Sequence, residues 1–301
     1  MKKQKTLYLG LLSLCLLAVL LFAAPVKAQA ASFKQCGRTV KTGKYYIWTD
    51  SRSNSLRIST SKSGSGSVLV SAASGRYLTY SCLSDGATVY YVERGTYDSK
   101  GNYTGYVCKI KTNGTGQATL GRLKNALHPT AYYKGSLYLD CYDPIDATLI
   151  HTYRMAVNTG KSKRTMKNAS VMEQSGRYLL AMPNSGALGP RRLSVYDCKK
   201  GKATTITKKA GSANFSGKKI YYSEYVAGEY SSSSTFRIRS CSLSAKSKKT
   251  LVKKIKATNT GMLTSKYAYY VTSDSRGKIK YYRYDIKKKK AAKIKSSKYL
   301  V

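Results

Sequence analysis

The chain has 301 residues, and its 54 Lys and Arg against 13 Asp and Glu give a formal net charge of +41. With 28 tyrosines, one tryptophan and only five prolines, and with abundant Gly, Ser and Thr, the composition favours strands and turns over helices. Six cysteines follow residue 30, a density too low for a scaffold held together by disulfides.

The first 30 residues have the pattern of an export signal. Lys2, Lys3 and Lys5 precede an uncharged apolar run at residues 7–24, and Ala28-Gln29-Ala30 is a small-x-small cleavage site. We therefore predict a signal peptide at residues 1–30 and a secreted protein. An uncleaved membrane anchor is the alternative, because a run of about 18 apolar residues just reaches across a bilayer. No second run of this length follows, so we expect no transmembrane span in the mature chain, residues 31–301.

The mature chain repeats a two-part motif six times. The first part is a glycine followed by an aromatic or apolar run, at residues 43–50, 86–93 and 217–224, with weaker copies from Gly135, Gly176 and Ser265. The second part ends at residues 60, 110, 157, 198, 243 and 286. Both parts alternate as strands do and lack the spacing of helices. A period near 45 residues is typical of one four-stranded propeller blade.

Turn sequences complete each repeat. Thr112-Asn-Gly-Thr115, Asn158-Thr-Gly-Lys161 and Lys199-Lys-Gly-Lys202 follow the second part, as a hairpin needs. The motif therefore holds strands 2 and 3 of a blade, strand 4 follows the turn, and strand 1 precedes the motif, at about Phe33–Lys41 in the first blade. We predict an all-β, six-bladed β-propeller of four-stranded antiparallel blades. It forms a single domain over residues 31–301, with blades at roughly 33–70, 71–122, 123–167, 168–208, 209–256 and 257–301.

One copy of the motif carries a family resemblance. Ile47-Trp48-Thr49-Asp50 resembles the signature of YWTD-type (LDL-receptor-like) six-bladed propellers, and residues 90–93, 221–224 and 269–272 are looser copies. The chain is similar to secreted bacterial propellers of unknown function related to that family. The resemblance implies the fold and a ligand-binding platform, and it implies no catalytic residue. The copies at Leu139-Asp140 and Leu180-Ala181 depart from the pattern.

The positive charge is uneven along the chain. Residues 151–301 hold 35 Lys and Arg against 6 Asp and Glu, whereas residues 31–150 hold 15 against 7. Lysines concentrate at the predicted strand 3–4 turns, and charge on this scale attracts polyanions. We predict that an anionic cell-wall polymer or another polyanion contacts one group of these, whereas nucleic acid is not expected as a physiological partner. The group is Lys287, Lys288, Lys289, Lys290, Lys293 and Lys295. Alternatively, lysines on outermost strands only block edge-to-edge pairing and keep the protein soluble.

Acids and tyrosines map to the opposite face of the predicted fold. Eight acids lie in or beside predicted strand 2–3 loops: Asp50, Glu93, Asp98, Asp143, Asp146, Glu224, Glu229 and Asp274. Four tyrosines accompany them: Tyr97, Tyr103, Tyr225 and Tyr230. We expect these tyrosines to contact a glycan, peptide or protein ligand.

The cysteines fall at strand positions. They are Cys36, Cys82, Cys108, Cys141, Cys198 and Cys241. An even number in an exported chain permits disulfides, but Cys108, Cys198 and Cys241 occupy the same kind of strand in different repeats, as small core residues do. We expect free or only partly paired cysteines.

Catalytic and metal patterns are weak. The only histidines, His128 and His151, lack the spacing of a zinc site and are interpreted as structural. Asp140, Asp143 and Asp146 could offer oxygen to calcium, but Pro144 among them indicates an ordinary turn. We predict no catalytic residue, no cofactor and no metal, and hence a non-catalytic extracellular binding or scaffold propeller. The alternatives are a propeller hydrolase or lyase acting on an anionic polysaccharide, and a purely structural module.

Overall fold

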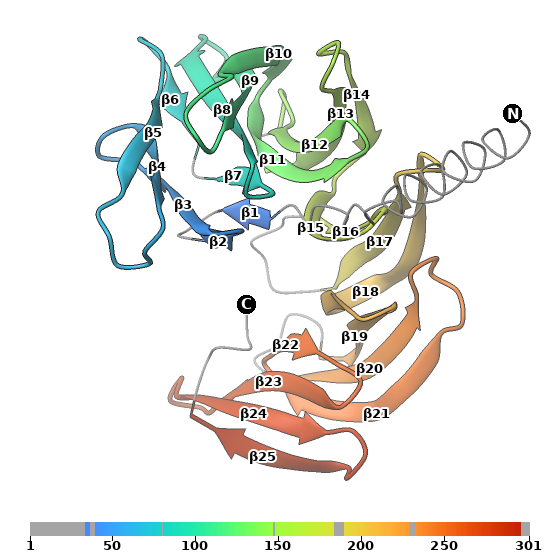
Figure 1. Ribbon diagram of the computed structural model, residues 1–301. Coiled ribbons are helices and arrows are strands. Elements are labelled where there is room, and N and C mark those ends of the chain that lie inside the picture. Colours follow the sequence, from blue (N-terminus) through green and yellow to red (C-terminus); the bar gives the residue numbers. More distant parts are fainter. Residues whose placement is uncertain are drawn as a thin grey trace, which may run out of the picture. The chain divides into compact units, whose positions relative to one another are not determined.

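The computed structural model describes residues 34–36, 40–79, 81–146, 148–183, 190–228 and 233–295. All the regular secondary structure in these ranges consists of β-strands (Figure 1). None of these residues forms a helix of the length and hydrophobicity that crossing a membrane requires. The predicted signal peptide lies outside the described residues.

The strands form five hydrogen-bonded antiparallel sheets, coloured in chain order in Figure 1. The first contains β2 (Val40–Thr42), β3 (Tyr45–Asp50), β4 (Ser55–Ser59) and β5 (Ser67–Ser71). The second contains β1 (Lys34–Cys36), β6 (Tyr77–Leu78), β7 (Cys82–Ser84), β8 (Thr88–Tyr97), β9 (Tyr103–Lys111) and β10 (Ala118–Lys124).

The other three sheets follow in the same way. The third contains β11 (Ala126–Tyr133), β12 (Ser136–Tyr142), β13 (Ile150–Ala156) and β14 (Ser162–Met166). The fourth contains β15 (Ser170–Ser175), β16 (Tyr178–Met182), β17 (Arg191–Asp197), β18 (Lys202–Ser216), β19 (Lys219–Ala227), β20 (Ser234–Ser242) and β21 (Lys249–Ala257). The fifth contains β22 (Asn259–Leu263), β23 (Tyr267–Ser273), β24 (Ile279–Asp285) and β25 (Lys290–Ile294).

A strand lies at each predicted strand 2: β3, β8, β12, β16, β19 and β23. In five of these places the strand follows a glycine with positive φ, such as Gly43 at 58° or Gly86 at 96°. Glycine tolerates this region of the backbone map far better than other residues do. The repeated glycine therefore marks the tight turn between the first and second strands in five of the six repeats.

The predicted first strand at about Phe33–Lys41 is wrong as a single element. The backbone there forms two strands, and β1 pairs with β7 of the second sheet whereas β2 pairs with β3 of the first. Sequence pattern does not distinguish these partners, because both segments are short and polar. Residues 37–39 between them lie outside the described residues.

The fourth sheet has seven strands because β18 takes part in two sets of pairings. Residues Lys202 to Ala210 pair with β17, and residues Ala210 to Ser216 pair with β19. One uninterrupted strand of 15 residues is thus the last strand of one four-stranded group and the first strand of the next.

Five described hydrophobic clusters hold consecutive groups of strands together. In the first, Ile47 and Leu56 of the first sheet pack with Val89 and Tyr91 of the second. The second to third and third to fourth sheets meet in the same way. One cluster lies between the two halves of the seven-stranded sheet, and another lies between β19–β21 and β22–β23. Packing of sheet faces against one another is therefore the main source of buried apolar area.

Cysteines contribute to these clusters as apolar side chains. Cys108, Cys141, Cys198 and Cys241 are buried thiols without a disulfide, as expected for small core residues. Burial raises the pKa of Cys198 and of Cys241 to about 11, so both thiols are protonated at neutral pH. The side chain of Cys36 lies outside what the structure describes.

Replacing Gly86 by alanine is expected to destabilise the fold more than replacing Gly101 by alanine. Both glycines have positive φ, 96° and 74°, so both substitutions introduce backbone strain of roughly 1 kcal/mol. A Cβ at Gly86 would also lie 3.2 Å from the backbone of Gly43, whereas a Cβ at Gly101 meets nothing within 4 Å. Urea unfolding of the two variants measures the difference. Equal losses of unfolding free energy would show that the close approach of Gly86 to Gly43 adds nothing to stability.

Candidate functional site

A pocket of about 650 Å³ brings together residues from four of the five sheets. Its lining comes from the β3–β4 turn, from β6, β8 and the start of β9, from the third sheet, and from β15. We call it the tyrosine pocket, defined by Tyr77, Arg94, Tyr97, His128, Asp140, Tyr142 and Ser170. Because its residues are spread from Ser51 to Met172, it forms only when the sheets have packed.

Three tyrosines give the pocket an aromatic surface that faces solvent. Tyr77 is 54% exposed, Tyr97 is 55% exposed and Tyr142 is 36% exposed. They are three of nine large hydrophobic side chains that are exposed among the described residues. Single exposed apolar residues are ordinary, but a group of them around one concavity is typical of a binding site.

Arg94 holds two of the tyrosines together. Its Nη1 donates a hydrogen bond of 2.7 Å to the hydroxyl of Tyr97. Its guanidinium carbon lies 5.7 Å from the ring centroid of Tyr77 and 5.4 Å from that of Tyr97, within the range of a cation–π contact. One arginine thus fixes two rings and keeps further N–H groups for a ligand.

The buried side chain of Tyr103 packs against Tyr97. Its ring meets that of Tyr97 edge-on at 5.3 Å between centroids, and its hydroxyl donates to the backbone oxygen of Ala126 at 3.0 Å. Tyr103 is buried, and burial raises the pKa of its hydroxyl well above the usual range. It therefore acts as a neutral support for Tyr97.

Asp140 and His128 form the floor of the pocket, directly opposite each other on β12 and β11. Asp140 has no exposed surface and accepts hydrogen bonds from Ser170 Oγ, from Thr152 Oγ1 at 3.4 Å and from the Val171 N–H at 3.4 Å. Burial raises the pKa of Asp140 to about 7, although these hydrogen bonds oppose the shift. Burial lowers the pKa of His128 to about 4, so its imidazole is neutral at pH 7.

The four tyrosines predicted to contact a ligand lie in different places. Tyr97 and Tyr103 do line the pocket. The prediction for Tyr225 is wrong, because β19 extends to Ala227 and its alternation turns Tyr225 into the core, 4.5 Å from the ring of Phe236 between centroids. Tyr230 lies outside the described residues.

The acids of the predicted loop face are mostly engaged in turns and ion pairs. Asp98 accepts the N–H groups of Lys100 and Asn102, which lowers its pKa. Glu93 is 2% exposed and pairs with Arg76 at 3.2 Å. These carboxylates therefore stabilise local structure rather than presenting negative charge to a ligand.

The same holds for the residues considered for metals. Asp143 caps a turn through the N–H groups of Ile145 and Asp146 and lies 2.8 Å from Nε2 of His151. Nδ1 of His151 accepts the N–H of Asn168 at 3.1 Å, which is the structural role that the sequence indicated. Within the described ranges, no group of three His, Cys, Asp or Glu side chains could hold a metal ion.

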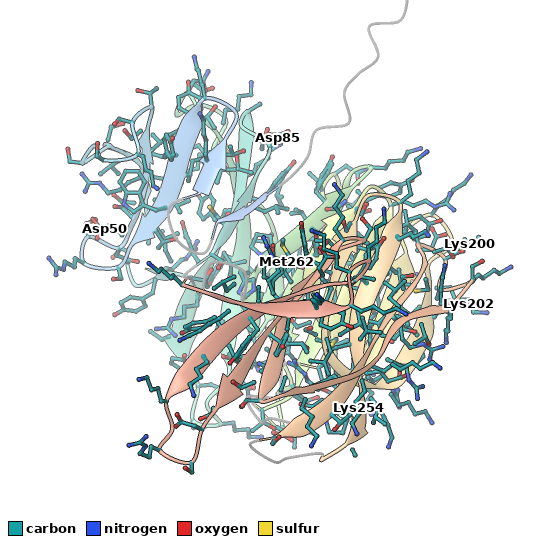
Figure 2. All side chains as sticks on the ribbon, turned by 90° about the horizontal axis from the view of Figure 1, so that it is seen from below. Asp50, Asp85, Lys200, Lys202, Lys254 and Met262 are labelled. Carbon is teal, nitrogen blue, oxygen red and sulfur yellow. The ribbon has the colours of Figure 1, made fainter. Side chains whose placement is uncertain are left out.

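The predicted polyanion-binding lysines occupy the last hairpin of the chain. Lys287, Lys288 and Lys289 form the β24–β25 turn, Lys290 and Lys293 lie on β25, and Lys295 follows it. All six predicted lysines are exposed. Lys200 and Lys202 sit at the corresponding β17–β18 turn and point away from the ribbon in Figure 2.

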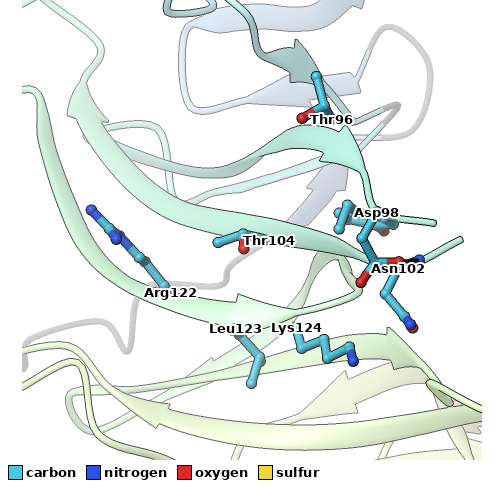
Figure 3. Close-up of a pocket in the computed structure, with 8 residues that line it drawn as sticks. Thr96, Asp98, Asn102, Thr104, Arg122, Leu123 and Lys124 are labelled. Atoms are coloured by element: carbon cyan, nitrogen blue, oxygen red, sulfur yellow. Dashed lines mark hydrogen bonds between the residues drawn. The ribbon is translucent and has the colours of Figure 1, made fainter. Parts of the chain in front are cut away.

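A second hollow, of about 450 Å³, lies beside the β8–β9 hairpin. Figure 3 shows Asp98 and Asn102 together at its end, with Lys124 below them on the neighbouring strand. Asn102 Oδ1 accepts from Asn125 Nδ2 at 2.7 Å, and Asp98 caps the hairpin as described above. Since these groups already hold the hairpin, this hollow offers less for a ligand than the tyrosine pocket.

No protein-family model matches the chain, and no curated protein sequence matches it. Among solved structures, the fold is similar to oligogalacturonate lyase from Vibrio parahaemolyticus, at 9% identity and a TM-score of 0.50 over 80% of this chain and 74% of that one. It also resembles the β-propeller domain of the Trilobed protease from Pyrococcus furiosus, at 14% identity and a TM-score of 0.46 over 74% and 72%. TolB from Acinetobacter baumannii is similar at 13% identity and a TM-score of 0.39 over 85% and 64%. At these identities the likeness shows a β-propeller fold and nothing about activity.

Asp140 should make the stability of the protein depend on pH. Its pKa is about 7 in the folded state against an ordinary value of 3.8, so it contributes most to stability below pH 4 and this contribution is lost as pH rises through 7. A shift of this size corresponds to roughly 4 kcal/mol. Asp140→Asn should therefore raise the unfolding free energy at pH 8 relative to the parent and much less at pH 4.

Asp98→Asn is the control for this measurement. The pKa of Asp98 is lowered by the turn, so its contribution is present above its usual pKa and is lost as pH falls. In urea unfolding between pH 4 and 8, the difference from the parent should grow with pH for Asp140→Asn and stay nearly constant for Asp98→Asn, because Asp98 titrates below this range. Parallel curves would contradict the assignment of Asp140 as the titrating group.

Proposed function

We propose that this β-propeller is an exported, non-catalytic binding protein that holds an acidic oligosaccharide in the tyrosine pocket. Its lysine-rich turns contact an anionic polymer of the cell surface. In this proposal the chain forms six four-stranded blades related to YWTD-type propellers, with β18 shared between the fourth and fifth. Residues 1–30 direct its export.

The observation that carries the proposal is the pair of exposed tyrosines around Arg94. A tyrosine ring offers a flat apolar face with a polar edge, which suits the C–H face of a sugar ring. An arginine fork matches the geometry of a carboxylate. Tyr77 and Tyr97 each lie within contact distance of Arg94, so in this proposal a single uronic acid unit engages all three.

The electrostatics favour an acidic over a neutral ligand. Asp140, the one carboxylate that lines the described pocket, is buried, and its pKa of about 7 leaves it largely uncharged below neutral pH. The whole chain carries +41, which speeds the encounter with any anionic chain. The hydroxyls of Ser51 and Ser81, which also line the pocket, suit sugar hydroxyls.

Oligosaccharide binding is expected to depend on the tyrosine–arginine group. Titration calorimetry with a uronic acid oligosaccharide should give a Kd that rises roughly tenfold in Arg94→Gln, since hydrogen bonds to charged groups contribute about 1.5–3 kcal/mol. Tyr97→Ala should weaken binding as well. Lys200→Gln removes an equal charge at an exposed turn and should leave the Kd nearly unchanged. Equal effects of the arginine and lysine variants would contradict a specific site.

A hydrolase or lyase is the second candidate, favoured by Asp140 and His128. A carboxyl with a pKa near 7 suits proton transfer at neutral pH, and a structural neighbour is named an oligogalacturonate lyase. Against it, Asp140 has no exposed surface and is hydrogen-bonded to Ser170. Chain-length analysis of the oligosaccharide after prolonged incubation decides: shortening that is lost in Asp140→Asn would establish the enzyme, and an unchanged length supports binding alone.

The β24–β25 lysines should anchor the protein to cell-wall material. Changing Lys287, Lys288, Lys289 and Lys290 to glutamine should reduce retention on isolated wall and flatten its dependence on salt, because exposed charge pairs are screened by salt. The matched control removes the same charge from exposed lysines of the first half, Lys41, Lys44, Lys62 and Lys100. Equal losses in both variants would mean that net charge acts without a specific surface, and retention unchanged in both would leave the lysines a role in solubility alone.

A further inference from the structure

A further cavity, of about 340 Å³, shares Met172 with the tyrosine pocket. It is lined by β15, β16, β17, β18 and β22, which belong to the fourth and fifth sheets. We call it the methionine pocket, defined by Met172, Glu173, Met182, Arg191, Phe215 and Met262. Its chemistry differs from that of the tyrosine pocket in both its walls and its charges.

The floor of the methionine pocket is closed by internal hydrogen bonds. The hydroxyl of Thr260 lies 2.8 Å from that of Ser212 and 2.6 Å from that of Ser223. Asn214 exchanges hydrogen bonds of 2.8 Å with the backbone of Leu263. These bonds join β18 to β22 across two sheets, so these side chains hold the pocket in shape and have little capacity left for a ligand.

Two charged side chains in the pocket, Arg191 and Glu173, can still form hydrogen bonds to a ligand. Arg191 donates from Nη2 to the Gly211 carbonyl at 2.7 Å. Its Nε is buried and has no hydrogen-bond partner in the described part of the protein, so the outer edge of the guanidinium is the part that faces the pocket. Glu173 accepts the Phe215 N–H at 2.7 Å with one oxygen. The pocket therefore offers one cation and one carboxylate, a balanced pair that gives no net attraction to a polyanion but can serve one acceptor and one donor.

Part of the wall is apolar and adaptable. Met172 is 45% exposed and Met262, labelled in Figure 2, is 37% exposed. With Phe215 they border a space of about 340 Å³, which holds one large side chain together with the peptide groups beside it. Methionine is flexible and polarisable, and it recurs at surfaces that accept apolar side chains of different shapes.

We propose that the methionine pocket binds an extended peptide segment by one large apolar side chain such as leucine. A peptide group presents one carbonyl and one N–H, which complement Arg191 and Glu173 on either side of the inserted side chain. An acidic sugar lacks the apolar side chain and would meet the Glu173 carboxylate. The protein would then join a peptide at one pocket to an oligosaccharide at the other, with Met172 as their common wall.

NMR of the methionine methyl groups in the full-length protein tests this directly, because the chain has only six methionines. The probe is the end-blocked pentapeptide Ala-Ala-Leu-Ala-Ala, and its partner is the same peptide with aspartate at the centre. The leucine peptide should shift the Met172 and Met262 methyl signals in a saturable manner. Met155 and Met166, buried in other clusters, should not move and report that the fold is intact.

Two variants make the result specific. Arg191→Gln should weaken peptide binding by roughly fivefold or more through loss of a charged donor. Met262→Ser alters an exposed wall residue without disturbing the core and should weaken it too. Tyr97→Ala, which tests the oligosaccharide site, should leave peptide binding unchanged.

Three outcomes would overturn the proposal. These are unmoved Met172 and Met262 signals at millimolar leucine peptide, equal shifts with the aspartate peptide, or a Met262 shift produced instead by the uronic acid oligosaccharide. Met262 is the decisive signal, because Met172 also lines the tyrosine pocket. Calorimetry on the Arg94 and Tyr97 variants tests oligosaccharide binding separately, so this proposal and the proposed function can fail independently.

Discussion

The packing of one sheet face against the next is the interaction on which the rest of this structure depends. Each described hydrophobic cluster lies between consecutive groups of strands, and each takes residues such as Ile47 and Tyr91 from both sides. A single group has no core of its own, because a lone antiparallel sheet buries no face. Repetition of the motif is thus a physical requirement, and the strand ends and connecting loops are the only parts left to vary for ligand contacts.

The tyrosine pocket illustrates how a site arises under this constraint. Its residues come from corresponding places in several repeats, yet each repeat contributes something different: Tyr77 and Arg94 from the second sheet, Asp140 from the third, Ser170 from the fourth. Asp140 also accepts hydrogen bonds from the next sheet through Ser170 and Val171. The same carboxyl therefore serves as a contact between sheets and as the floor of the cavity, which links the site to the packing that builds it.

Much of the fold could be predicted from sequence, because glycine turns and alternating strands are local signals. The repeat period led to the all-β propeller class, whereas the number of blades and the export signal remain predictions. The prediction of one first strand was wrong because the strand with which β1 pairs is not determined by local sequence. The prediction that Tyr225 faces a ligand was wrong because β19 extends far enough to point this side chain into the core.

Tyr77, Arg94 and Tyr142 were not predicted as site residues from the sequence, and His128 and Asp140 were given only structural or loop roles. Their meeting depends on pairing across residues 51–172, although the Tyr-Tyr-Val-Glu-Arg run before Tyr97 was a usable signal for Arg94.

The continuity of β18 between two repeats limits how the repeats can evolve. Elsewhere in the described chain a repeat ends and the next begins at a break between strands, where a unit can be gained, lost or exchanged as a cassette. Through Lys202–Ser216 no such break exists, and a cut there would divide one strand whose two halves pair with β17 and with β19. The repeats on either side of β18 are therefore bound to be inherited together, as a double module in an otherwise divisible chain.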